Sequence, residues 1–156
     1  MVEIASKVDV AYQSELWVGR YPSGGTGTPV FTQVLGVETI GMPEQSPEDI
    51  DVTHMQSSGA TRETIPGLLP VVDYAQEMQD WADDPGQIIL DELATLTAQR
   101  QREDIVVEMV IGDRRRSYRA YVNSFTPTGT VGGKAMASAA FKVMNRLATN
   151  PRVVTP

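Results

Sequence analysis

The sequence lacks cysteine and holds a single histidine, His54, among its 156 residues. Without cysteine, the chain forms no disulfide and offers no thiolate as nucleophile or metal ligand. One histidine also excludes a multi-histidine zinc site within one chain. Aromatic residues are scarce, at 6%. Few of them remain for an aromatic-lined binding pocket once a core is built.

Long hydrophobic runs are missing too. The longest apolar runs span a few residues, far short of the roughly 20 that a membrane helix needs. The first residues, Met1 to Lys7, contain no apolar stretch of signal-peptide length. These absences predict a soluble protein made in a cytoplasm. With 41% hydrophobic residues, the chain suits a single globular domain over 1–156, with an N-terminal arm at 1–10 and an extended tail at 146–156.

Positive charge is also in short supply, and it is unevenly placed. The net charge of −7 argues against a simple nucleic-acid binder, which needs a basic surface. Residues 38–92 hold thirteen acids and one base, whereas residues 98–156 hold ten bases and four acids. Two solvated faces would explain this segregation. If the fold keeps the two segments on different surfaces, it favours head-to-tail packing into rings or stacks.

Alternation of apolar and polar residues predicts a mainly antiparallel β fold, a sandwich or barrel with one flanking helix. Between Ile105 and Phe125 the turn signal Gly112-Asp113 joins two strands into a hairpin. Gly36 is expected to interrupt its strand. The expected strands cover 11–18, 30–40, 50–55, 71–80, 105–111, 115–125 and 134–144. The expected irregular segments are 20–29, 41–48, 56–70 and 126–133.

One helix is predicted at about 85–101. Asp84 is a favourable N-cap, and Pro85 suits the first helical position. Apolar residues then recur at helical spacing. Acids early in the segment and bases at its end match the helix dipole. The stripe is Ile89, Leu93 and Leu96, the acids are Asp91 and Glu92, and the bases are Arg100 and Arg102.

Three clusters invite a chemical interpretation, and each has a simpler one. His54 with nearby Asp51 and either Ser57 or Ser58 suggests a Ser-His-Asp triad. No Gly-x-Ser-x-Gly motif is present, so a hydrogen-bonding or interface histidine is favoured. Asp80, Asp83 and Asp84 could bind calcium, yet a capped helix start explains them better. The glycine-rich segments 24–27 and 129–133 could bind phosphate, but neither has the Gly-Lys-Ser/Thr ending of a phosphate-binding loop, so mobile hairpin tips are favoured. We therefore predict no catalytic residue, no metal and no cofactor.

The basic run Arg114-Arg115-Arg116 has three interpretations. It could contact nucleic acid, although few aromatic residues accompany it for stacking. It could be a solvated hairpin end. We favour an interface with an acidic patch of another subunit.

Several segments in order resemble one protein family. They are Ile50–Leu68, the acidic strand 71–80, Asp84-Pro-Gly-Gln87 and the closing strand Ala135–Met144 with Asn150-Pro151 after it. Together they resemble the tail tube proteins of long-tailed, non-contractile bacteriophages, whose tubes have counterparts in gene transfer agents. The resemblance extends over about residues 15–152.

The resemblance implies a structural virion protein without enzymatic activity. Such subunits form hexameric rings that stack into a hollow tube around a tape measure protein, and DNA later passes through the lumen. The implied partners are further copies of the chain, the tape measure, and the tail terminator and distal tail proteins, with no membrane; assembly takes place in the host cytoplasm.

The sites follow from that role. DNA must slide through the lumen, so the lumen should repel the DNA phosphates or at least not bind them. Acidic positions on strand 71–80 are therefore candidates for lining the lumen. The long segments 20–29 and 41–69 are candidates for contacts between subunits and rings. The predicted interface residues are Asp51, His54, Arg62, Glu63, Arg114, Arg115 and Arg116, and the lumen candidates are Asp73, Glu77 and Asp80. The alternatives are a terminator or distal tail protein, a small β-sandwich binding module and, last, a hydrolase.

Overall fold

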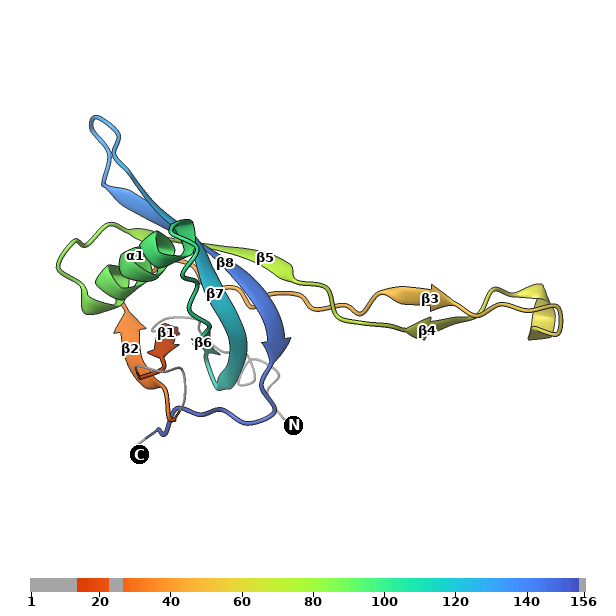
Figure 1. Cartoon of the computed structure of the whole chain (residues 1–156). Coiled ribbons are helices and arrows are strands. Elements are labelled where there is room, and N and C mark those ends of the chain that lie inside the picture. The colour runs from red at the N-terminus through yellow and green to blue at the C-terminus, as the bar shows by residue number, and fades with distance from the viewer. Residues whose placement is uncertain (1–13, 23–26, 155–156) are drawn as a thin grey trace, which may run out of the picture.

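The computed structural model describes residues 14–22 and 27–154, and it consists of a compact body with a long projecting arm (Figure 1). The body is one antiparallel sheet of order β2-β1-β6-β7-β8-β5 with a single helix packed on it. The predicted mainly β class with one helix is confirmed. The body elements are β1 (Glu15–Arg20), β2 (Val30–Val34), β5 (Val72–Gln79), α1 (Pro85–Ala98), β6 (Ile105–Ile111), β7 (Arg114–Thr128) and β8 (Met136–Arg146).

The two edges of this sheet approach each other just beyond β2. Val37 forms a bridge with Met78 of β5, and the Gln79 amide donates to the Gly36 carbonyl over 2.8 Å. Gly36 has a φ of 85°, which glycine adopts readily and other residues rarely. The expected break at Gly36 is therefore confirmed, and β2 ends at Val34 rather than continuing to residue 40. The turn at Gly36 curls the sheet toward a barrel.

The core lies between the concave side of the sheet and α1. Alternate residues of β8 point into it: Ala137, Ala139, Phe141 and Val143 are all buried. The strand predicted at 134–144 begins later, at Met136, and Ala135 before it is exposed. Leu90 and Leu93 of α1 close the core from the other side. Within the described ranges, no helix is long and apolar enough to cross a membrane.

The helix begins as predicted but ends earlier. The Asp84 side chain accepts a hydrogen bond from the Gln87 amide, and Pro85 is the first helical residue. At the other end, the amide of Arg100 donates to Thr97 and that of Gln101 donates to Leu96. With a φ of 62° at Arg100, this is a Schellman ending, and the helix stops at Ala98.

The expected match to the helix dipole is therefore wrong. The first turn holds no acid and the last turn holds no base. Arg100 and Arg102 lie beyond the helix, because the chain reverses there to enter β6.

The prediction of an irregular segment at 56–70 is also wrong. Within it, β4 (Thr64–Pro66) pairs with β3 (Asp49–Asp51), so that Ile50 lies opposite Ile65. A short 3₁₀ turn, η2 (Ser58–Ala60), forms the tip between them. The strand predicted at 50–55 is only three residues long. Each of these strands has only three residues, which is too few to show an alternation of apolar and polar residues. Their partners are also 15 residues apart, as in the pair Ile50 and Ile65, so no tight-turn motif marks the hairpin.

The hairpin joined by Gly112-Asp113 is confirmed, but its second strand is longer than predicted. β7 continues to Thr128 because it pairs with β8 along its whole C-terminal half. The irregular segment predicted at 126–133 therefore lies at 129–135, between β7 and β8. The first strand covers Glu15–Arg20 instead of 11–18, and the predicted arm at 1–10 lies outside the described residues.

Candidate assembly surfaces

The arm of β3 and β4 projects from the body without contacts that bury its side chains (Figure 1). Ile50 and Ile65 lie opposite each other and are each 48% exposed, and Val52 follows on the same face. Asp49, Asp51 and Thr64 occupy the other face by alternation. A two-stranded hairpin alone is marginal in water. An arm with one uncovered apolar face is therefore suited to packing against another surface.

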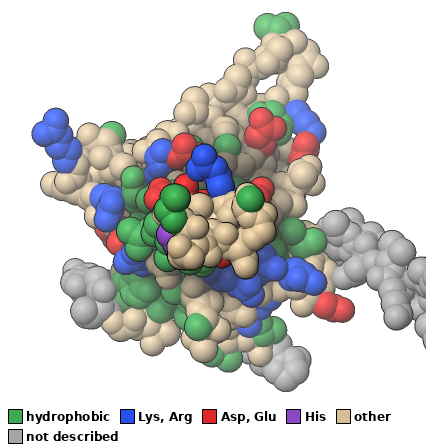
Figure 2. Space-filling view, turned by 90° about the vertical axis from the view of Figure 1, so that its right-hand side faces the viewer, with side chains coloured by type: hydrophobic (Ala, Val, Ile, Leu, Met, Phe, Trp, Pro, Cys, Tyr) green, Lys and Arg blue, Asp and Glu red, His purple; other side chains and the backbone are tan. Residues whose placement is uncertain are grey.

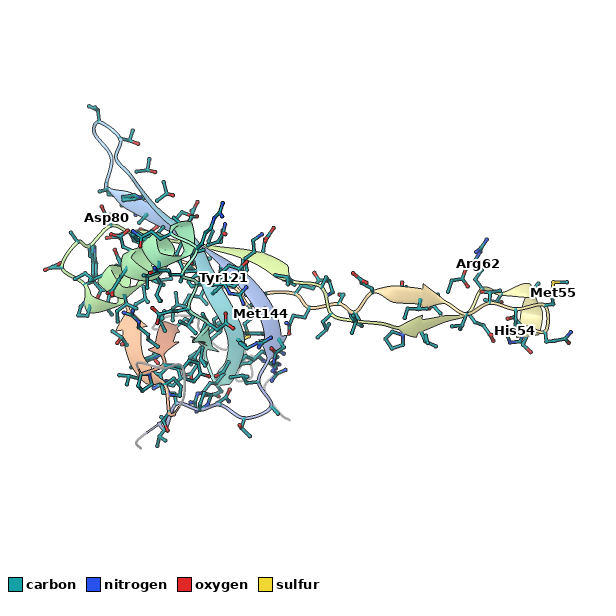
Figure 3. All side chains as sticks on the ribbon, viewed as in Figure 1. His54, Met55, Arg62, Asp80, Tyr121 and Met144 are labelled. Atoms are coloured by element: carbon teal, nitrogen blue, oxygen red, sulfur yellow. The ribbon has the colours of Figure 1, made fainter. Side chains whose placement is uncertain are left out.

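The tip of the arm brings together four residues predicted as an interface. Arg62 lies 3.1 Å from Asp51, and Nε2 of His54 lies 3.7 Å from Glu63. Hydrogen bonds from Thr53 hold the pKa of Asp51 below its ordinary value, and Arg62 adds to this effect. His54, Met55 and Arg62 stand at the far end of the arm in Figure 3. In Figure 2 the arm points toward the viewer, with green apolar side chains and the purple of His54 exposed.

The hydrogen bonds at the tip do not form the catalytic triad considered for His54 and Ser57. The hydroxyl of Ser57 donates to Glu63 over 3.0 Å rather than to His54. Nδ1 of His54 accepts the Gln56 amide at 3.0 Å, so this nitrogen is engaged by the backbone. These bonds stabilise the turn at the tip, in agreement with a hydrogen-bonding histidine.

The structure separates the three arginines of the basic run. Arg115 points to the outer face of the sheet, where its Nη2 lies 2.9 Å from Oε2 of Glu108 and donates to the Arg152 carbonyl. Glu108 is fully buried. Arg114 is exposed and Arg116 half-buried, on the other side of β7. Arg115 is thus committed to a contact within its own subunit, whereas its two neighbours are not.

A C-terminal latch, which we define as Arg152 with Glu108 and Trp17, was missed by sequence reasoning. Nε and Nη2 of Arg152 each lie 2.7 Å from Oε1 of Glu108, and its guanidinium lies 4.1 Å above the Trp17 ring. These residues come from the tail, β6 and β1, so no local spacing connects them. The only available signal was a charged residue, Glu108, within an otherwise apolar strand.

The three lumen candidates do not form one row. Asp73 and Glu77 lie on the exposed face of β5, and Lys142 of β8 forms an ion pair with Asp73 that raises the pKa of Lys142. Asp80 lies beyond the end of β5 (Figure 3), where its amide donates to the Ala135 carbonyl over 3.0 Å. The acidic character of this face is consequently lower than the sequence of β5 alone suggests.

A cavity of about 300 Å³ opens on the same face. Asp73, Ala75, Asn123 and Lys142 contribute to its lining, along with the aromatic residues Tyr74 and Phe141. Those two rings pack against each other within the core, 6.0 Å apart. The volume is at the lower limit for small-molecule sites, about 300–1,000 Å³. The cavity therefore gives little support to a binding module.

Comparison with known proteins gives a consistent result. A chain in the tail of an empty gene transfer agent particle, determined with C6 symmetry, superimposes with a TM-score of 0.60 at 17% identity, covering 83% of this chain and 91% of that one. The chain has the tail tube protein fold. The resemblance predicted from the sequence is confirmed at the level of the fold.

Two further structures share the tail tube fold. A chain of the sheath–tube complex of an extracellular contractile injection system matches with a TM-score of 0.62 at 9% identity, covering 94% and 97% of the two chains. The SPP1 tail tube matches with a TM-score of 0.54 at 14% identity, covering 85% and 75%. No protein family model matches the sequence, and no curated protein does so either.

Proposed function

We propose that this protein is the structural subunit of a tail tube, forming hexameric rings that stack into a hollow tube. The observation that carries the proposal is the tail tube fold over most of the chain, combined with an arm whose apolar face no other described residue covers. The body is already closed by β5 and α1. Because the described residues leave the apolar face of the arm uncovered, that face is suited to packing against another molecule.

Within this proposal the lumen conducts DNA without binding it specifically. Asp73 and Glu77 lie on an exposed strand face that would offer phosphate little attraction, although Lys142 reduces the effect. The tape measure protein fills the lumen during assembly, and the terminator and distal tail proteins bind the two ends. The protein acts in the virion and has no catalytic activity.

The test is electron microscopy of the concentrated protein at low and high salt, alone and mixed with its neighbouring tail proteins. We expect long hollow tubes or stacked rings. A terminator or distal tail protein would give single rings, and a binding module would stay monomeric in every mixture. Either of these results would refute the proposal.

A matched variant separates assembly from folding. Replacing residues 50–65 with an Asn-Gly turn joins Asp49 to Pro66, which already pair across the two strands. Because the arm buries no side chain in the body, we expect an unchanged melting temperature and no tubes. Normal tubes from this variant would exclude the arm as an assembly element.

A further inference from the structure

Three arginines at one end of the body have no acidic partner among the residues that the structure describes. Arg114 and Arg116 alternate with Tyr118 along β7, and Arg146 of β8 lies directly opposite Tyr118. Residues that alternate along a strand, or lie opposite each other on neighbouring strands, share one face. Arg114, Arg116 and Arg146 therefore form a patch, which we name the basic end.

Among residues 14–22 and 27–154, no carboxylate forms an ion pair with this arginine patch. Nε of Arg116 is buried without a hydrogen-bond partner. Nε of Arg115 is also buried without a hydrogen-bond partner, but Arg115 has a carboxylate neighbour in Glu108, as Arg20 has in Glu92 and Glu103. A guanidinium without a carboxylate partner gains more from a new carboxylate than one that is already paired.

Acids without a basic partner gather at the opposite end of the same strands. Gln79 at the end of β5 and Thr128 at the end of β7 both pair with Met136, the first residue of β8. Asp80 and Asp83 follow directly, before α1 begins, and neither forms an ion pair with a described base. We name these two residues the acidic end. Ten residue steps of β8 separate it from Arg146, about 33 Å at the rise of a strand.

We infer that the basic end of one copy docks on the acidic end of the next copy, an inference that rests on the proposed function. Two different patches at opposite ends of one molecule make a heterologous contact, which extends into a ring or a stack instead of closing as a dimer. A second copy fits the basic end better than nucleic acid does, because every copy presents an acidic end that can meet it. The chain as a whole is also acidic, with a net charge of −7, which disfavours binding to phosphate.

The experiment is a charge swap read by the critical concentration for polymer formation at low salt. The variant Arg116→Glu/Arg146→Glu and the variant Asp80→Lys/Asp83→Lys should each raise this concentration at least about tenfold, since like charges then face each other. Arg100→Glu is the matched control: Arg100 also forms no ion pair with a described acid but lies after α1, so this variant should leave assembly unchanged. Melting temperatures establish that each variant folds.

The decisive step combines the two swaps. An equimolar mixture of the two double variants, or one chain with all four substitutions, should recover assembly to within about threefold of wild type, because opposite charges again meet. Failure of both combinations would overturn the inference, as would normal polymers from the first variant. Loss of duplex DNA binding without loss of assembly would assign the basic end to nucleic acid instead.

These outcomes are distinguishable from failure of the proposed function. If wild type forms no tube in any mixture, the tube subunit proposal fails. In that case, sedimentation equilibrium at low and high salt still measures self-association through the two ends. The two double variants, the chain with all four substitutions and the Arg100→Glu control then test the docking of the basic end on the acidic end.

Discussion

Replacing the buried carboxylate of the latch with an amide should cost a substantial part of the stability. Glu108→Gln keeps the shape of the side chain and removes its charge, leaving Arg115 and Arg152 without their main counter-charge. Breaking a buried ion pair by removing one partner typically costs about 3–5 kcal/mol. Here the arginine side chains are 23% and 14% exposed, so they can partly hydrate. We expect a loss of about 2–3 kcal/mol, below the range for a fully buried pair.

The measurement is urea unfolding followed by tryptophan fluorescence, in which Trp17 reports directly on the latch. A loss of this size corresponds to a decrease in melting temperature of roughly 4–12 °C for a domain of this length. Glu103→Gln is the matched control, because Glu103 also contacts an arginine through its carboxylate but is 36% exposed. Exposed pairs contribute about 0–1 kcal/mol.

Equal losses of stability in the two variants would refute this prediction. So would a Glu108→Gln variant within about 0.5 kcal/mol of wild type, the usual range for surface substitutions. Either outcome would mean that the buried carboxylate contributes no more than a surface charge does.

Three further predictions concern the body. Asp84→Ala should cost about 1–2 kcal/mol in urea unfolding, because the Asp84 carboxylate caps α1 and also accepts the Leu35 amide. Gly86→Ala should destabilise by about 1–3 kcal/mol, since its Cβ would lie 2.4 Å from the Gln33 carbonyl oxygen; Gly41→Ala, with nothing within 4 Å, should be neutral. Burial raises the pKa of Tyr74 to about 12 from 10.0. The unfolded tyrosine therefore ionises first, and stability should fall as pH rises between these values, a slope that Tyr74→Phe should reduce.

Local patterns were enough to predict the elements that depend on neighbouring residues. The helix start at Asp84 and Pro85 was correct, because a cap and a first-turn proline act within four residues. The hairpin around Gly112 was correct, because adjacent strands need only alternation and a tight turn. The helix end was wrong, since the Schellman ending at Arg100 uses a residue without a sequence preference for that conformation.

The candidate site was predicted less completely. Asp51, His54, Arg62 and Glu63 do meet at one place, because they lie on both sides of one hairpin tip. Arg115 was grouped with Arg114 and Arg116 from adjacency alone. Strand alternation places it on the opposite face from them, where Glu108 neutralises it.

The sequence by itself determined the class of fold, the tail tube resemblance and the segregation of charge along the chain. Only the tertiary structure decided which charges remain unpaired and where they lie. Arg152 reaches Glu108 across 44 residues, and Lys142 reaches Asp73 across 69. Composition counts charges, but pairing depends on which strands are neighbours, and strand order is set by burial of the whole core rather than by any local spacing.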